Sequence, residues 1–114
     1  MYFTESEFRC RCGCGLSEVN PLLIESLESL RVMVGKPIIV NSGIRCAKHN
    51  SAVGGAKASQ HLLGNAADIH VDGITSYELA NLASEIPAFG NGGIGRYANF
   101  VHVDVRGVMS RWYG

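Results

Sequence analysis

The stretch SQHLLGNAADIHV, Ser59 to Val71, combines two histidines and an aspartate with small residues. Its second half, AADIHV, is typical of a strand, and alternate side chains of a strand share a face. Asp68 and His70 would therefore point to the same side, with His61 entering from the preceding loop. These polar side chains form either a hydrogen-bonded corner of an ordinary domain or part of a metal site.

A second polar pair lies in NFVHVDV, residues 99–105, whose strict alternation predicts another strand. Its valines share one face, while His102 and Asp104 share the other. If the two strands are neighbours, His102 approaches Asp68. Two imidazoles and one carboxylate then form a three-ligand site with an open fourth position, as in catalytic zinc sites. The alternative is a set of hydrogen-bonded structural histidines.

Two helices with marked ends flank these strands. NPLLIESLESLRVMVGKP has Asn20 as its cap and Gly35 as its stop, and TSYELANLASEIP begins with a capping box of Thr75 and Glu78. Each helix carries an apolar stripe that would pack on the core, formed by Leu23, Leu27, Leu30 and Val34 in the first and by Leu79, Leu82, Ala83 and Ile86 in the second.

The remaining segments suggest short elements. PIIV (37–40) is typical of a buried strand, AKHNSAV (47–53) of a short helix, and GGAKAS (54–59) and FGNGGIG (89–95) of loops. Helices precede and interrupt short strands without a regular βαβ rhythm, so the predicted class is α+β. With 114 residues, positions 1–114 are expected to form a single domain.

Composition excludes several classes of protein. Hydrophobic residues make up 46% of the chain and charged residues 18%, which indicates a globular domain. Ten basic and ten acidic residues balance, and the absence of a basic run argues against nucleic-acid binding. No signal peptide is visible in MYFTESEFRC, and no apolar run approaches the roughly 20 residues of a membrane span. We therefore expect synthesis in the cytoplasm.

The cysteines are unusually placed. Cys10, Cys12 and Cys14 alternate in CRCGCG, and Cys46 stands alone. Cysteines two apart bridge each other poorly, and paired zinc ligands are usually separated by about two to four residues. We therefore expect free thiols in a turn, with one disulfide to Cys46 or a metal site as the alternatives.

A known family shows the same motif. Ser59, His61, Gly64, Ala66 and Asp68 spell S-x-H-x-x-G-x-A-x-D, and FVHVD supplies a later histidine. This pattern resembles the zinc D-alanyl-D-alanine carboxypeptidase family of peptidoglycan peptidases, whose fold is shared by the hedgehog signalling domain. SGIR and HNSAVGG are similar to the compact branch of that family found in bacteriophage and prophage genomes.

The resemblance runs from Phe8 to Trp112 and implies a small antiparallel sheet with helices packed on one side. It also implies a Zn²⁺ ion held by His61, Asp68 and His102, with a water in the fourth position. Zinc in such a site lowers the pKa of the water and polarises the carbonyl group to be cleaved.

Other residues receive roles from the same resemblance. Arg45 would steady the substrate carbonyl oxygen as it gains charge, the alternative being a surface ion pair. We expect Ser59 and Gln60, which directly precede His61, to bind substrate. His70 is expected to be a bystander or the partner of a ligand.

One position departs from the family pattern. Many members carry Asp or Glu as the general base three residues before the last ligand, where this chain has Asn99. An amide cannot accept the proton at neutral pH. Asp104, on the same strand face as His102, could take over that role, or it could orient His102. Both roles for Asp104 remain open.

The resemblance implies a zinc metallopeptidase that cleaves stem peptides of bacterial peptidoglycan, either as a D-Ala-D-Ala carboxypeptidase or as an endolysin-type endopeptidase. It would act as a monomer on the cell wall after release, with no nucleic-acid or membrane partner. The alternative is a non-catalytic wall-binding or phage structural domain that retains the fold.

Overall fold

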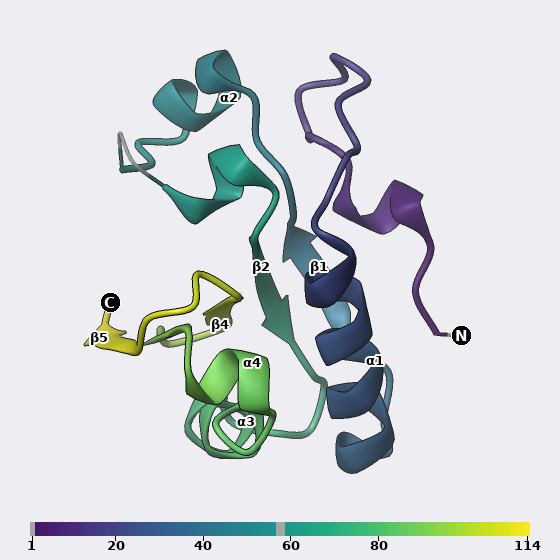
Figure 1. Ribbon diagram of the computed structural model, residues 1–114, viewed down its shortest axis with the longest axis vertical. Coiled ribbons are helices and arrows are strands. Elements are labelled where there is room, and N and C mark those ends of the chain that lie inside the picture. Colours follow the sequence, from purple (N-terminus) through teal and green to yellow (C-terminus); the bar gives the residue numbers. More distant parts are fainter. Residues whose placement is uncertain (1, 57–58) are drawn as a thin grey trace.

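A computed structural model describes residues 2–56 and 59–114 (Figure 1). The predicted loop 54–59 lies partly outside the described residues. The helices are η1 (Glu5–Phe8), α1 (Pro21–Val34), α2 (Ala47–Ala52), η2 (Gln60–Leu63), α3 (Ser76–Ala83) and α4 (Pro87–Gly90). The strands are β1 (Ile39–Ser42), β2 (Ala66–His70), β3 (Gly93–Arg96), β4 (Val101–Asp104) and β5 (Ser110–Tyr113).

One five-stranded sheet organises the chain, in the order β1-β2-β4-β3-β5. Strands β2 and β4 are antiparallel neighbours, and Asp68 lies directly opposite His102. The α+β class and the pairing of these two strands are therefore confirmed. The expectation of a wholly antiparallel sheet is wrong at one edge, because β5 pairs parallel to β3. After β4 the chain turns back past the N-terminal end of β3, where Gly93 pairs with Ser110. Strand β5 therefore runs antiparallel to β4 and parallel to β3.

Two strands escaped the sequence pattern. The segment FGNGGIG was expected to be a loop, but it contains the end of α4 and the first residues of β3. Strand β3 reads GIGR, and glycine has low strand propensity. The glycines are needed for space: an added Cβ would lie 2.2 Å from Asp104 Oδ2 at Gly93 and 2.3 Å from Trp112 Nε1 at Gly95. Strand β5 was also missed.

The two main helices follow their sequence signals. Helix α1 begins where the backbone N–H of Leu22 donates to Asn20 Oδ1 at 3.0 Å, and it ends at Gly35 in the left-handed conformation. Helix α3 has the expected capping box of Thr75 and Glu78. Strand β1 begins later than predicted and includes Asn41 and Ser42, with a register irregularity after Val40.

The core lies between the sheet and helices α1, α3 and α4, which lie on one side of it (Figure 1). Val101 and Val103 of β4 and Ile69 of β2 enter this core, with Leu27 and Leu79 from the helices. The opposite face of the same strands therefore carries their polar side chains. Among the described residues, no helix combines the length and apolar character needed to cross a membrane.

The helix-to-sheet core predicts the effect of a truncation. Leu27 is fully buried, so Leu27→Ala should lower the free energy of unfolding by about 2–5 kcal/mol through lost burial and a residual cavity. Val32 on the same helix is 70% exposed, and Val32→Ala should change it by about 0.5 kcal/mol or less. Urea unfolding measures both; equal effects would contradict this packing.

Candidate metal centre

Three buried side chains converge on the polar face of the sheet. His61 comes from η2, Asp68 from β2 and His102 from β4. Asp68 Oδ1 lies 3.1 Å from His61 Nε2 and 3.2 Å from His102 Nδ1. The three side chains are thus brought together, although Asp68 and His102 are 34 positions apart in sequence and His61 precedes Asp68 by 7.

Hydrogen bonds fix how His61 faces the cluster. Its Nδ1 lies 2.7 Å from the carbonyl oxygen of Gly43, which can only accept, so Nδ1 carries the proton. The Nε2 atom is therefore left with a lone pair directed toward Asp68. Ser59 caps η2 by accepting from the backbone N–H of His61, and Gly64 ends η2 with a φ of 71°.

His102 is held in the opposite sense. Its Nε2–H donates to Asp104 Oδ2 at 2.7 Å, which leaves Nδ1 facing Asp68. Asp104 is completely buried and also accepts from Arg106 and from the backbone N–H of Gly93. Asp104 therefore acts on His102 from the side away from Asp68.

The surroundings of Asp68 and Asp104 keep both carboxylates negatively charged. Burial by itself raises the pKa of Asp68, but His102 and His61, which donate to its carboxylate when their rings carry a second proton, outweigh burial and hold that pKa below its usual range. Burial likewise opposes ionisation of Asp104, but bonds from His102 and Arg106 keep its pKa low. Burial lowers the pKa of His102, and its contacts with Asp104 and Asp68 raise it more. Both carboxylates are therefore ionised at neutral pH.

The donor set fits a zinc ion. Nitrogen and oxygen ligands bind zinc at about 2.0–2.1 Å, so two ligand atoms of a tetrahedral site lie about 3.3 Å apart. The observed separations of 3.1 and 3.2 Å are close to that value. The outer nitrogen of each histidine is also hydrogen-bonded, which fixes the tautomers in the way metal sites require.

Arg45 adjoins this cluster and is mostly buried. Its guanidinium group donates to Asp68 Oδ2 at 3.2 Å, and also to Ser42 and Asn50. The side chain is 13% exposed, so its ion pair with Asp68 is not the surface pair considered as the alternative. Arg45 holds the carboxylate oxygen that faces away from both histidines.

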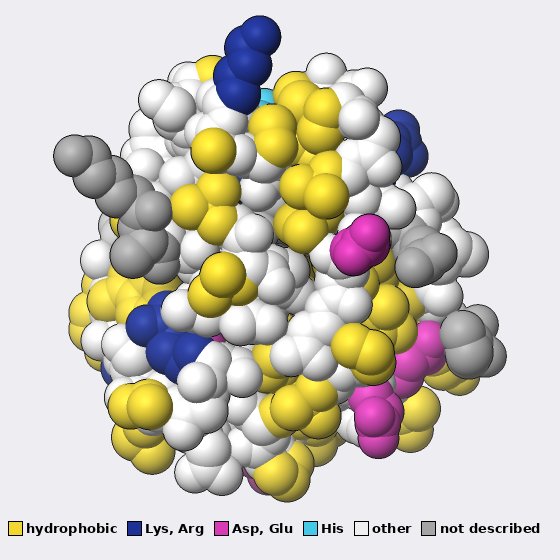
Figure 2. Space-filling model, turned by 45° about the horizontal axis from the view of Figure 1, so that its top comes forward, with side chains coloured by type: hydrophobic (Ala, Val, Ile, Leu, Met, Phe, Trp, Pro, Cys, Tyr) yellow, Lys and Arg dark blue, Asp and Glu magenta, His cyan; other side chains and the backbone are white. Residues whose placement is uncertain are grey.

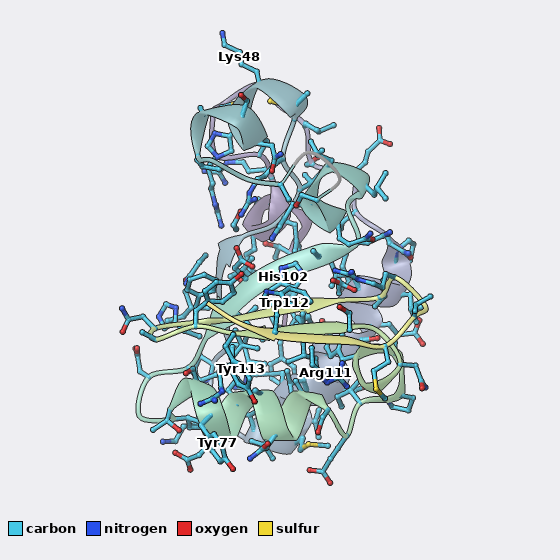
Figure 3. The ribbon with its side chains drawn as sticks, turned by 90° about the vertical axis from the view of Figure 1, so that its left-hand side faces the viewer. Lys48, Tyr77, His102, Arg111, Trp112 and Tyr113 are labelled. Atoms are coloured by element: carbon cyan, nitrogen blue, oxygen red, sulfur yellow. The ribbon has the colours of Figure 1, made fainter. Side chains whose placement is uncertain are left out.

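The cluster lies at a cleft of about 380 Å³. Arg45 and Ser59 line this cleft and were predicted as site residues. Tyr97, Arg106 and Trp112 also line it, but the sequence did not predict them. The Trp112 ring lies 5.0 Å from the His102 ring, and its Nε1–H donates to the Tyr97 hydroxyl at 2.9 Å. Trp112 belongs to β5, a strand that the sequence pattern did not predict. In Figure 3, His102 and Trp112 lie close together in the sheet, away from Lys48 on α2.

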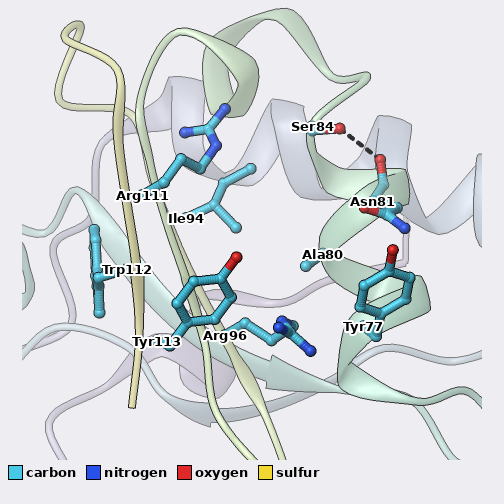
Figure 4. A pocket seen from close by; sticks show the side chains of 9 residues that line it. All are labelled: Tyr77, Ala80, Asn81, Ser84, Ile94, Arg96, Arg111, Trp112 and Tyr113. Atoms are coloured by element: carbon cyan, nitrogen blue, oxygen red, sulfur yellow. Dashed lines mark hydrogen bonds between the residues drawn. The ribbon is translucent and has the colours of Figure 1, made fainter.

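A second hollow of about 360 Å³ lies between β5 and α3 (Figure 4). Arg111 and Tyr113 point into it, while Trp112 points to the other side of the strand (Figure 4). The Arg96 guanidinium lies over the rings of Tyr77 and Tyr113, and Arg111 donates to backbone carbonyls. The described residues that line this second hollow include no carboxylate and no histidine, whereas His61, Asp68 and His102 all line the first cleft.

Other predicted site residues lie outside the cleft. The Gln60 side chain accepts from Asn65 and does not line the cleft, so its expected contact with substrate is not supported. The His70 ring is hydrogen-bonded to the side chain of Asn41. His70 and Asn99 both line a different hollow.

The structure also bears on the two roles left open for Asp104. Both of its oxygens accept hydrogen bonds, and the side chain has no exposed surface. A general base must reach the proton that it removes. This geometry favours the second role, in which Asp104 orients His102. The first role, transfer of the proton, stays a prediction. The strand pattern placed both side chains on one face but could not show that they bond to each other.

Comparison with known proteins gives a consistent result. The family model described as Peptidase M15 matches residues 1–104. The peptidoglycan L,D-endopeptidase MepK of Escherichia coli (strain K12) is 33% identical over 106 residues, covering 85% of this chain and 56% of that protein. The probable peptidoglycan L,D-endopeptidase MepK of Haemophilus influenzae is 31% identical over 107 residues, covering 85% and 55%.

A third relative matches over a shorter stretch. The zinc D-Ala-D-Ala carboxypeptidase of Streptomyces albus G is 50% identical over 44 residues, which cover 38% of this chain and 17% of that protein. This chain spans about half the length of the MepK proteins that it matches.

The contacts of Asp104 predict the effect of removing its charge. Asp104→Asn should weaken zinc binding by about 10–100-fold, because the amide orients the imidazole of His102 less well. Turnover at saturating zinc should change far less. Competition with a chelator measures the affinity, and Asp72→Asn, the same change at an exposed carboxylate outside the cleft, serves as the control that should alter neither quantity. Unchanged affinity with a turnover about 10²-fold lower would instead indicate that Asp104 transfers the proton.

Proposed function

Because the chain belongs to the peptidase M15 family, we propose that it is a zinc-dependent peptidase that cleaves stem peptides of bacterial peptidoglycan. The observation that carries the proposal is the convergence of His61, Asp68 and His102 at an accessible cleft, with each histidine oriented through its outer nitrogen. Histidines that only support the fold would not need to direct His61 Nε2 and His102 Nδ1 at the same oxygen of Asp68 beside a cleft.

Zinc held by these three residues would polarise the carbonyl group of the substrate and activate a water for attack on it. The residues of the chain complete the site. Arg45 keeps a fixed positive charge beside Asp68 and lines the cleft, where it can stabilise the negative charge that develops on the substrate oxygen.

Tyr97 is a further candidate for contact with the substrate. Its hydroxyl oxygen accepts a hydrogen bond from Trp112, so its own O–H is left to donate. Because Tyr97 lines the same cleft, this donor can bind a carbonyl or carboxylate oxygen of the peptide. Ser59, also on the cleft wall, is retained as a substrate-binding candidate.

Within this class we favour an endopeptidase. The relatives named as L,D-endopeptidases match 85% of the chain, whereas the relative named as a D-Ala-D-Ala carboxypeptidase matches 38%. The high identity of that shorter match keeps carboxypeptidase activity as the second candidate. Either activity requires the chain to reach the cell wall, and we propose that it does so after release from the cell.

Mass analysis of digested muropeptides tests this function. The zinc-loaded chain should split cross-linked peptides into two fragments, whereas a carboxypeptidase would release only a terminal amino acid. His61→Ala should abolish cleavage because it removes a ligand, and His70→Ala, outside the cleft, should retain it. If the zinc-loaded chain cleaves no muropeptide, the proposed activity is wrong and a non-catalytic role in wall binding or phage structure takes its place.

Arg45 yields a second prediction. Arg45→Lys should lower turnover by about 10²–10³-fold, the usual loss when one donor to a developing oxyanion is removed, because an ammonium cannot reproduce the planar fork of donors. The effect on the free energy of unfolding should be much smaller, since the positive charge beside Asp68 remains. Paired rate and urea-unfolding measurements compare the two effects. Wild-type turnover in this variant would show that Arg45 only supports the fold.

A further inference from the structure

All four cysteines of the chain meet at one point, away from the histidine cluster. Their sulfur atoms all lie within 4.8 Å of one another. Cys10 Sγ is 3.4 Å from Cys12 Sγ and 3.7 Å from Cys46 Sγ, and Cys12 Sγ is 3.6 Å from Cys46 Sγ. Three of these residues come from one loop and the fourth precedes α2, so the fold itself brings them together.

The separations suit a shared metal ion better than a disulfide. A disulfide requires sulfur atoms about 2.05 Å apart, and all four cysteines are free thiols in this structure. Zinc binds thiolate sulfur at about 2.3 Å, so two sulfurs of a tetrahedral site lie about 3.8 Å apart. The three printed distances, from 3.4 to 3.7 Å, are close to that value.

The backbone supports the same arrangement. The N–H of Cys46 donates to Cys10 Sγ at 3.4 Å, and the N–H of His49 donates to Cys46 Sγ at 3.4 Å. Both N–H groups are directed at a sulfur atom, so the backbone at the start of α2 holds Cys10 Sγ and Cys46 Sγ in place. Cysteine here also caps a helix, a position usually held by an oxygen-bearing side chain.

The loop explains why alternate cysteines can converge. Gly13 has a φ of 83°, and the backbone N–H of Cys10 donates to the carbonyl of Leu16 at 2.7 Å, so the chain folds back on itself. Paired zinc ligands are usually separated by about two to four residues, but this turn brings cysteines only one residue apart to the same point. In this tight turn Cys12 and Cys14 can both face Cys46.

We propose that Cys10, Cys12, Cys14 and Cys46 bind a second zinc ion in a closed, structural site. Four sulfur ligands fill the tetrahedral coordination of zinc and leave no position for substrate. The site would fasten the loop of residues 10–15 to the start of α2. Of those loop residues only Cys10 is buried, so the apolar core does little to hold the loop in place.

The place of this site gives it a role in the cleft. Cys46 directly follows Arg45, whose guanidinium contacts Asp68, and Asn50 of α2 binds the same guanidinium. Metal bound to Cys46 would therefore fix the backbone that carries Arg45. Figure 2 turns the top of Figure 1, where α2 lies, toward the viewer, and hydrophobic side chains, among which cysteine is coloured, are scattered over this face between a few charged ones.

Metal analysis of the chain of residues 1–114, prepared with a reductant, tests the proposal. The wild type should hold about two equivalents of zinc, and His61→Ala should retain about one, because the cysteine site is intact. Cys12→Ser should also hold about one, and Ser17→Ala, two residues after the loop, serves as the control with two. A wild type with one equivalent that His61→Ala removes entirely would overturn the proposal. The His61→Ala result does not depend on the folding of any cysteine variant.

Cobalt replacement supplies an independent readout. Co²⁺ bound to the His61→Ala variant should show the charge-transfer absorption of cobalt–thiolate bonds. Adding Cys12→Ser to that variant should weaken this absorption. Absence of that absorption in a His61→Ala chain with full cobalt loading would overturn the cysteine ligands. Because four sulfurs also suit iron, iron is measured beside zinc, and one equivalent of iron in its place would overturn the identity of the metal. Neither result depends on peptidase activity, so failure here is distinct from failure of the proposed function.

Discussion

The direct pairing of Asp68 with His102 across β2 and β4 is the constraint on which the rest of the structure depends. The antiparallel register places both polar side chains on one face and sends Val101 and Val103 into the core on the other. A shift of one residue would reverse both faces at once, burying charge in the core and exposing the valines. The same register therefore fixes the fold and assembles the candidate site, and neither can be changed alone.

Buried charge makes the site costly unless every charge has a partner. The structure meets that requirement in layers: Asp68 contacts both histidines and Arg45, and Asp104 contacts His102, Arg106 and the backbone of Gly93. Every described buried polar side-chain atom has a hydrogen-bond partner. This explains why Asp104, the carboxylate nearest to His102 in sequence, is fully occupied and faces away from the cleft.

Much of the fold could be predicted because its signals are local. The caps of α1 and α3 and the alternation in β2 and β4 are readable from neighbouring residues. The alternation placed Asp68 and His102 on polar strand faces, and the resemblance to a zinc peptidase family joined His61 to them. Strand β3 could not be predicted, because its glycines serve Asp104 and Trp112, which lie far along the chain. Trp112 and Tyr97 could not be assigned to the cleft for the same reason, because their partners there are distant in sequence. Strand alternation indicates the face on which a side chain lies, but not which neighbour it contacts there.

The cysteines also show that spacing in sequence does not fix position in space. Their spacing argued against a shared metal ion, but the turn at Gly13 brings their sulfur atoms together. Their position also separates two kinds of support for the cleft. Asp68 and His102 are held by the sheet and by buried hydrogen bonds, whereas Arg45 stands on a short segment between β1 and α2. A metal at Cys46 would act on Arg45 through one peptide bond. It would also act on His61 through the same segment, because the backbone N–H of Arg45 donates to the carbonyl of His61 at 3.0 Å and the carbonyl of Gly43 accepts from His61 Nδ1. Asp68 and His102 would then depend on strand register, and the placement of Arg45 and His61 would depend in part on the cysteine cluster.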